Sequence, residues 1–127
     1  MPNLVELAEI TPIRVWEGVV ARRVQGEQLT LAVVELAPDS IVPEHRHPNE
    51  QCGIVIRGQV RFRIGEEIRD IGPGGTWRIL GNEAHEVHTG PEGATVIDVF
   101  APIRSDWEAL PVAGTPDDPA PMTWPAR

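Results

Sequence analysis

Hydrophobic and polar residues alternate in short runs through most of this chain. The clearest run spans residues 59–64, Gln-Val-Arg-Phe-Arg-Ile, and it places Val60, Phe62 and Ile64 on one face of a strand. Similar runs, separated by turns that contain Gly, Pro or Asn, predict strands over residues 13–24, 28–37, 51–56, 59–64, 67–71, 76–80, 85–88 and 94–101. No stretch before residue 104 sustains a helical period. The pattern therefore indicates an all-β sandwich or barrel.

The carboxy-terminal part of the chain has a different pattern. Prolines recur there, which excludes a strand or a long helix, at positions 102, 111, 116, 119, 121 and 125. Ser105 and Glu108 have the spacing of a capping box and predict a short helix of one or two turns. Beyond Leu110 we expect an extended tail, with Trp124 docked on the barrel or on a neighbouring subunit. The predicted organisation is a barrel domain over residues 1–110 and a Pro-rich tail over residues 111–127.

Length and composition narrow the possible chemistry. The 127 residues are enough for one domain with one core. The 11 basic residues, all of them Arg, face 19 acidic ones, and the resulting net charge of −8 argues against nucleic acid or an anionic membrane surface as a partner. The lack of Lys excludes a Schiff base or a P-loop. A single Cys excludes an internal disulfide and a cysteine-rich zinc site.

The first ten residues have no targeting signal that we recognise. They are mildly apolar, but they carry Glu6 and Glu9 and have no basic flank, unlike a signal peptide. No apolar stretch approaches the ~20 residues of a membrane-spanning helix. We therefore expect a cytoplasmic protein.

The four histidines fall into two clusters. His45 and His47 differ by two, so on a strand both imidazoles point to the same face, as a metal site on a β-scaffold requires. His85 and His88 differ by three and face opposite ways on a strand, so at most one of them joins such a site. The spacing alone leaves open which of the two that is. A histidine taken alone is more often a surface or hydrogen-bonded residue, and only the joint pattern favours a metal site.

These residues together resemble a known family. The run His45-x-His47, three residues, Gln51, six residues and Gly58 is similar to the first motif of single-domain cupins, H-x-H-x(3,4)-E-x(6)-G, with Gln in the place of Glu. Gly74 and His85 match the second motif, so the resemblance implies that His85 is the third imidazole, and we expect His88 to be structural or exposed. The resemblance covers residues 28–101 and implies a cupin-type antiparallel β-barrel (jelly roll) that pairs as a homodimer. It also implies a divalent transition metal held by His45, His47, Gln51 and His85.

The type of ligand leaves the identity of the metal open. Three neutral imidazoles and one amide oxygen would leave two positions of an octahedral site for water or substrate. Ni, Zn, Mn, Fe and Co all accept such ligands, and availability rather than affinity decides among them. Gln51 is an even number of positions from His45 and His47, so on a strand its side chain would face the same way as theirs. Its neighbour Cys52 should face the opposite side of the strand.

A narrower resemblance concerns the possible substrate. The phrases His-x-His-Pro-x-Glu-Gln at 45–51 and Asp-x-Phe-x-Pro-x-Arg at 98–104 are similar to those of KdgF-type cupins, which ketonise unsaturated uronates. This resemblance implies that Asp98 shuttles a proton and that Arg104 binds the carboxylate of an anionic sugar acid. The alternatives are a hydrogen-bonded strand carboxylate for Asp98 and a solvated loop residue for Arg104.

Three functions remain open on the sequence. The first is a metal-dependent isomerase of a sugar acid. The second is a metal-dependent oxygenase, in which three histidines hold Fe(II) and the open positions admit O₂ and substrate. The third is a non-catalytic barrel that only captures a small metabolite. Metal content, oxygen uptake and ligand binding would separate the three.

Overall fold

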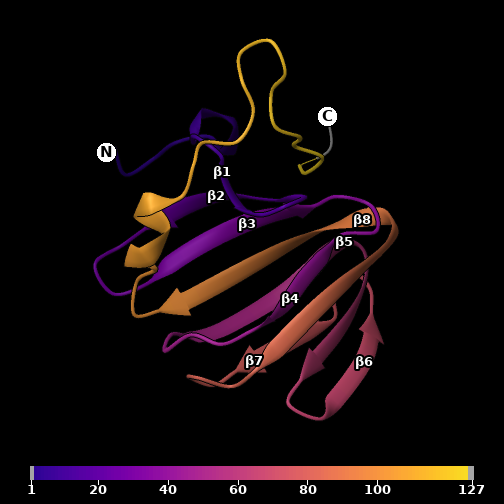
Figure 1. Cartoon of the computed structure of the whole chain (residues 1–127). Coiled ribbons are helices and arrows are strands. Elements are labelled where there is room, and N and C mark those ends of the chain that lie inside the picture. Colours follow the sequence, from indigo (N-terminus) through magenta and orange to yellow (C-terminus); the bar gives the residue numbers. More distant parts are fainter. Residues whose placement is uncertain (1, 126–127) are drawn as a thin grey trace.

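The protein folds into one antiparallel sheet whose strands curl into a barrel (Figure 1). The computed structural model describes residues 2–125. Two short 3₁₀ helices flank the strands, η1 (Leu7–Glu9) before them and η2 (Ser105–Ala109) after them. The strands are β1 (Ile13–Trp16), β2 (Val19–Gln25), β3 (Thr30–Leu36), β4 (Ile41–His45), β5 (Glu50–Ile64), β6 (Glu67–Ile71), β7 (Thr76–Ile79) and β8 (His85–Ala101).

Two long strands, β5 and β8, join the layers of the barrel. The strand order is β1-β2-β3-β8-β5-β6, and β4 pairs with β8 while β7 pairs with β5. The second half of β8 pairs with β3, and its first half pairs with β4. Figure 1 shows both strands bending from the upper layer to the lower one. This arrangement confirms the predicted all-β, cupin-type jelly roll.

The long strands correct two of the predicted boundaries. Residues 51–56 and 59–64 belong to β5, and residues 85–88 and 94–101 belong to β8, rather than to four separate strands. The glycine at the bend of β5, Gly58, has φ of +85°. A Cβ there would collide with the backbone of Gly93 and Ala94 on β8. Gly58 therefore permits a bend and a close approach within one strand, where the sequence pattern suggested a turn.

In the amino-terminal half, the observed strands differ from the predicted ones in two further places. The predicted strand over 13–24 is a hairpin, in which β1 and β2 meet at Gly18 with φ of +75°. Strand β4 was not predicted. Only Val42 in this strand is buried, and Pro43 interrupts the run, so the alternation that marks other strands is weak there.

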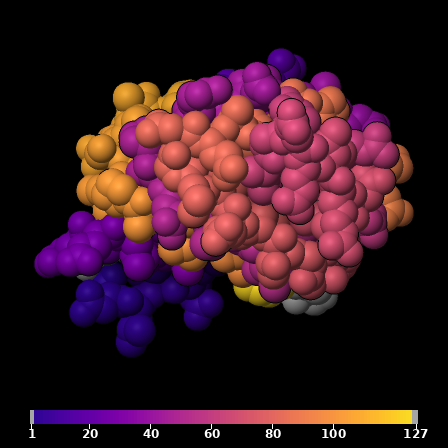
Figure 2. All heavy atoms as spheres, turned by 90° about the horizontal axis from the view of Figure 1, so that it is seen from below, coloured from indigo at the N-terminus to yellow at the C-terminus, as the bar shows by residue number. Residues whose placement is uncertain are grey.

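The interior of the barrel is filled by aliphatic and aromatic side chains. Val55 and Ile79 are almost fully buried there, and Trp77 packs against Phe62 with ring centroids 4.9 Å apart. Cys52 is exposed, as its position next to the inward-facing Gln51 predicted. Seen from below, in Figure 2, the surface is formed largely by the middle of the chain, coloured magenta to orange, and amino-terminal residues project at one edge.

The carboxy-terminal segment begins with a short helix, as predicted, but the expected capping box is absent. Ser105 lies inside the 3₁₀ helix η2, whose N-cap is Arg104 and has no side-chain capping bond. Trp107 of this helix is buried in the core. Within residues 2–125, no helix has the length and apolar character that crossing a membrane requires.

The segment after η2 runs along the outside of the barrel. Its first part lies beside β1, where Pro111 O accepts a hydrogen bond of 2.9 Å from Arg14 N. Further on, Thr123 N donates to the buried carboxylate of Glu35 at 2.7 Å. Trp124, for which we expected a docked position, is half-buried. These bonds hold the segment itself against the barrel.

Candidate metal centre

Three histidines converge inside the barrel. His45 ends β4 and is the register partner of His85, which begins β8. His47 lies two residues beyond β4, in the loop before β5. One ring nitrogen from each residue lies within 4.8 Å of the other two. The expectation that His45 and His47 share a strand face is therefore wrong in its geometry, because the chain leaves the strand between them, although both rings reach the same point.

Hydrogen bonds fix the orientation of all three rings. Each Nδ1 lies within hydrogen-bonding distance of a backbone carbonyl oxygen two residues away, at Pro43 O for His45 (2.8 Å), Asn49 O for His47 (3.0 Å) and Glu83 O for His85 (2.8 Å). A carbonyl oxygen can only accept, so each Nδ1 must carry the hydrogen. In the neutral rings the Nε2 lone pairs are left to face the centre of the site, which is the tautomer that a metal ligand needs.

Burial keeps these rings neutral. Desolvation lowers the pKa of His45 and of His47, and it lowers the pKa of His85 to about 4. The positive charge of Arg104 acts in the same direction on all three. His85 is 2% exposed, and its Nε2 has no hydrogen-bond partner among the described residues. A buried acceptor without a partner costs free energy that a bound cation would recover.

Gln51 on β5 connects the histidines to Asp98. Its Nε2 donates to Asp98 Oδ1 at 2.8 Å, and its Oε1 lies 3.1 Å from His47 Nε2. In this arrangement both atoms of the second contact are acceptors, because His47 carries its hydrogen on Nδ1. Two facing lone pairs repel each other unless a cation lies between them.

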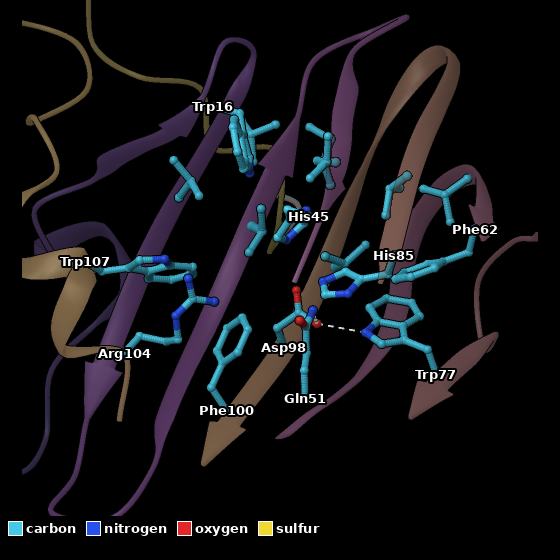
Figure 3. A pocket seen from close by; sticks show the side chains of 18 of the residues that line it. Trp16, His45, Gln51, Phe62, Trp77, His85, Asp98, Phe100, Arg104 and Trp107 are labelled. Carbon is cyan, nitrogen blue, oxygen red and sulfur yellow. Dashed lines mark hydrogen bonds between the residues drawn. The ribbon is translucent and has the colours of Figure 1, made fainter. Parts of the chain in front are cut away.

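Asp98 lies in β8 with its carboxylate buried. Trp77 Nε1 and Gln51 Nε2 both donate to Oδ1, each at 2.8 Å (Figure 3). Burial raises the pKa of Asp98 to about 6, although both hydrogen bonds and the charge of Arg104 oppose this effect. Oδ2 receives no hydrogen bond from residues 2–125 and remains available to a ligand. Asp98 is thus a desolvated and partnered carboxylate beside the histidines.

Arg104 lies between two aromatic rings and points into the cavity (Figure 3). Its Cζ is 4.7 Å from the ring centroids of both Phe100 and Trp107. Nε and Nη2 donate to the two oxygens of Asp106 at 3.1 and 2.9 Å. Arg104 is 8% exposed, so it is not the solvated loop residue of the alternative interpretation. Its bidentate fork is already occupied, which leaves Nη1 for another anion.

The sequence did not reveal Asn49 as a residue of the site. Its side chain is 5% exposed and donates to Pro102 O at 2.7 Å and to Ile103 O at 3.2 Å, while its own carbonyl accepts from His47. Asn49 therefore joins the loop of one histidine to the segment that precedes Arg104. Only its place within the 45–51 phrase hinted at a role. The contacts of Trp77 with Asp98 and of Asp106 with Arg104 also had no local signal.

The converging groups line a cavity of about 250 Å³. Its polar lining residues are His45, Gln51, His85, Asp98, Arg104 and Asp106, and its other walls are aliphatic or aromatic. The site thus brings the predicted metal and catalytic residues together, although His47 lies behind the lining. His88 is exposed, as predicted, and its Nε2 lies 2.8 Å from Glu86 Oε1.

The donor set fits a divalent transition metal. His45, His47 and His85 are positioned to bind an ion through neutral imidazoles, and the unpartnered His85 Nε2 and the facing acceptors of His47 and Gln51 are both explained by a cation. When bound, such an ion supplies a Lewis acid that polarises substrate oxygens. Gln51 is the one other ligand candidate among the predicted residues.

Comparisons with known proteins agree with this geometry. The profile of the cupin domain matches residues 32–100. The pectin degradation protein KdgF of Dickeya dadantii (strain 3937) is 30% identical over 83 residues, which are 65% of this chain and 76% of that protein.

Solved structures show the same fold. The structure of KdgF from Halomonas sp. aligns with a TM-score of 0.76 and 21% identity, over 84% of this chain and 98% of that one. An RmlC-like cupin from Shewanella frigidimarina aligns with a TM-score of 0.77 and 17% identity, over 84% and 96%. Since the profile matches more than half of the chain and the three-histidine barrel agrees with it, the chain belongs to the cupin domain family and is similar to KdgF.

Proposed function

We propose that this protein is a metal-dependent isomerase that moves a proton within a small carboxylated substrate. The observation that carries the proposal is the position of Asp98. Its free Oδ2 shares one small cavity with three imidazoles directed at a common point and with a guanidinium. An acid–base group beside a metal site and an anion-binding group is the set of parts that enol–ketone conversion requires.

Unsaturated uronates are the first substrates to test. The similarity to a pectin degradation protein supports this choice, because pectin is a polymer of galacturonate. In such a substrate a C4=C5 double bond is conjugated with the carboxylate, and ring opening yields an enol. The enol hydroxyl loses one proton and C4 gains one, so the conversion uses no oxidant or reductant.

Each residue of the site has a role in this proposal. His45, His47, His85 and Gln51 hold the metal. Asp98 Oδ2 holds the proton that moves to the substrate carbon, and Trp77 keeps the carboxylate in place through Oδ1.

Arg104 binds the substrate carboxylate through Nη1. The aromatic rings on both sides exclude water from the guanidinium, and Asp106 fixes its plane. A desolvated, oriented cation binds an anion more strongly than an exposed one.

The test uses protein purified without a metal-affinity tag. Its metal content is measured, and the metal-loaded form is incubated with 4,5-unsaturated galacturonate in D₂O. We expect the double bond to disappear, one deuterium to enter the product and no O₂ to be consumed. Asp98→Asn should abolish most of the turnover, whereas Asp70→Asn, at an exposed carboxylate paired with Arg61, should not.

Other outcomes would select the alternative functions. Oxygen uptake by the iron-loaded protein would indicate an oxygenase. Binding of a carboxylate without turnover, and equally in His45→Ala, would indicate a non-catalytic binding protein. Homodimer formation and a cytoplasmic location remain predictions; light scattering and cell fractionation test them.

A further inference from the structure

Two tryptophans that line the cavity have unused hydrogen-bond donors. They are Trp16 at the end of β1 and Trp107 in η2. Trp77 Nε1 donates to Asp98, but within residues 2–125 the Nε1 atoms of the other two have no acceptor. Neither nitrogen is sealed in the core, because the buried polar atoms without a partner in this part of the chain belong to other residues. Both indole N–H groups are therefore free to donate to a ligand.

An irregularity in β1 turns the side chain of Trp16 toward the cavity. The register with β2 shifts between Arg14 and Trp16, so Val15 is an extra residue on this strand. Neighbouring residues of a regular strand face opposite sides, yet Val15 and Trp16 both line the cavity. Bulges of this kind are common beside functional sites, where they redirect a side chain. The redirected indole lies beside one of the three converging histidines, with its ring centroid 5.5 Å from that of His45 (Figure 3).

Trp107 is less available to a ligand than Trp16. Its ring covers Arg104, with 4.7 Å between Cζ and the ring centroid, and it packs edge-on against Phe100. It is also buried in the core. Trp16 is only half-buried, and within residues 2–125 the one aromatic ring paired with it is His45. Trp16 is thus the tryptophan whose ring and N–H both remain open to a ligand.

A hydroxylated carboxylate needs the groups that this indole provides. Arg104 Nη1 is available for the carboxylate, and the converging histidines can hold an ion that binds a further oxygen. Hydroxyl groups elsewhere on the substrate need partners of their own, because their burial without a hydrogen bond is unfavourable. The aliphatic walls, such as Val15 and Val19, offer none. The N–H of Trp16 can donate to a hydroxyl oxygen, and its ring can cover the C–H face of a sugar.

We infer that Trp16 is a specificity-determining residue, which packs against the carbon skeleton of a hydroxylated sugar acid and donates its indole N–H to one of the hydroxyl oxygens. The inference deepens the proposed function and rests on it only in taking this cavity as the substrate site, with the carboxylate at Arg104. It gives the cavity a preference for hydroxylated carboxylates over carboxylates without hydroxyl groups, such as acetate.

The first experiment compares two carboxylates in three forms of the protein. Calorimetry measures binding of galacturonate and of acetate to the metal-loaded parent, to Trp16→Phe, which keeps an aromatic ring but lacks the N–H, and to Trp124→Phe. We expect Trp16→Phe to weaken galacturonate binding about threefold to tenfold, the effect of one hydrogen bond, and to leave acetate binding unchanged. Trp124 is half-buried but is not among the lining residues that the structure describes, so its variant should match the parent. Unchanged galacturonate binding in Trp16→Phe, an equal loss for acetate, or no binding of galacturonate by the parent would overturn the inference.

A second measurement uses the parent protein and does not depend on whether a variant folds. Protein loaded with Zn²⁺ and labelled with ¹⁵N gives one indole N–H signal for each of its four tryptophans. On saturation with galacturonate the assigned Trp16 signal should move and the Trp124 signal should not, and acetate should move the Trp16 signal less. A Trp16 signal that stays in place with galacturonate would contradict the inference.

Binding and turnover separate this inference from the proposed function. A protein that binds galacturonate through Trp16 but converts no unsaturated galacturonate would refute the proposed function alone. A protein that converts it with an unchanged KM in Trp16→Phe would refute the inference alone.

Discussion

Gln51 Oε1 lies 3.1 Å from His47 Nε2, although hydrogen bonds elsewhere make both atoms acceptors. The contact is unfavourable in the metal-free protein and favourable around a cation. The same side chain donates to Asp98, so one amide joins the metal ligands to the acid–base candidate. In the proposed function, this connection would couple metal ligation and proton transfer at Gln51.

A Gln51→Glu change tests that coupling. The new carboxylate adds a negative charge beside the ion and should retain the metal or bind it more tightly. It also removes the donor to Asp98 and places two carboxylates in contact, so the metal-free protein should lose thermal stability and turnover should change. Metal titration and thermal unfolding measure both effects. Unchanged metal binding and unchanged activity would show that Gln51 lies outside the site.

The histidines predict how stability depends on pH in the metal-free protein. The pKa of His85 is lowered to about 4 in the folded state, below the ordinary value of ~6.5 in an unfolded chain. The unfolded state therefore binds the proton first as the pH falls. This contribution to stability is complete above pH ~6.5 and is lost between there and pH 4.

Thermal unfolding of chelator-treated protein at several pH values measures this effect. The decline from pH 7 to pH 4 should be shallower in His85→Asn than in the parent protein. The comparison removes the contribution of carboxylates, which titrate in both proteins. An identical decline would contradict the buried, neutral state of this ring.

Asp98→Asn separates proton transfer from packing. The Asn Oδ1 can accept from both Gln51 and Trp77, so the fold and the metal content should persist. Turnover should fall by about 10²-fold or more, the usual contribution of a positioned acid–base group. Thermal stability, bound metal and kcat are measured on one sample. A destabilised but fully active variant would assign Asp98 a structural role only.

Arg104 and Asn49 predict effects on substrate binding. Arg104→Lys keeps the charge but loses the planar guanidinium that lies between Phe100 and Trp107, so KM should rise more than kcat falls.

Asn49→Ala leaves two carbonyl oxygens without their donor and should cost about 1–3 kcal/mol of stability. Its KM should also rise, with metal content retained, since the backbone carbonyl that orients His47 is unchanged. Loss of metal in Asn49→Ala would contradict this division of roles.

The sequence predicted the fold class and the identity of the converging histidines because both depend on short periods. Alternation located most of the strands. The spacing of His85 and His88 showed that only one of them could point inward, and the resemblance to the cupin motif identified that residue as His85. The short helix after Arg104 was also recognised from local residues, although its capping was not.

The remaining features depend on contacts between distant segments. Gly58 resembles a turn residue until β8 is seen beside it, and β4 has too few buried positions to show a period. The partners of Asp98 come from β5 and β7, and those of Asn49 from the end of β8. No local pattern encodes such pairs.

The most direct test of the account is the metal content of four single variants, measured by elemental analysis on untagged protein. His45→Ala, His47→Ala and His85→Ala should each lose the metal, because each removes one of three converging imidazoles. His88→Ala should retain it, because that ring lies outside the site and pairs with Glu86. Retention of the metal in His85→Ala together with its loss in His88→Ala would contradict the site described for this barrel.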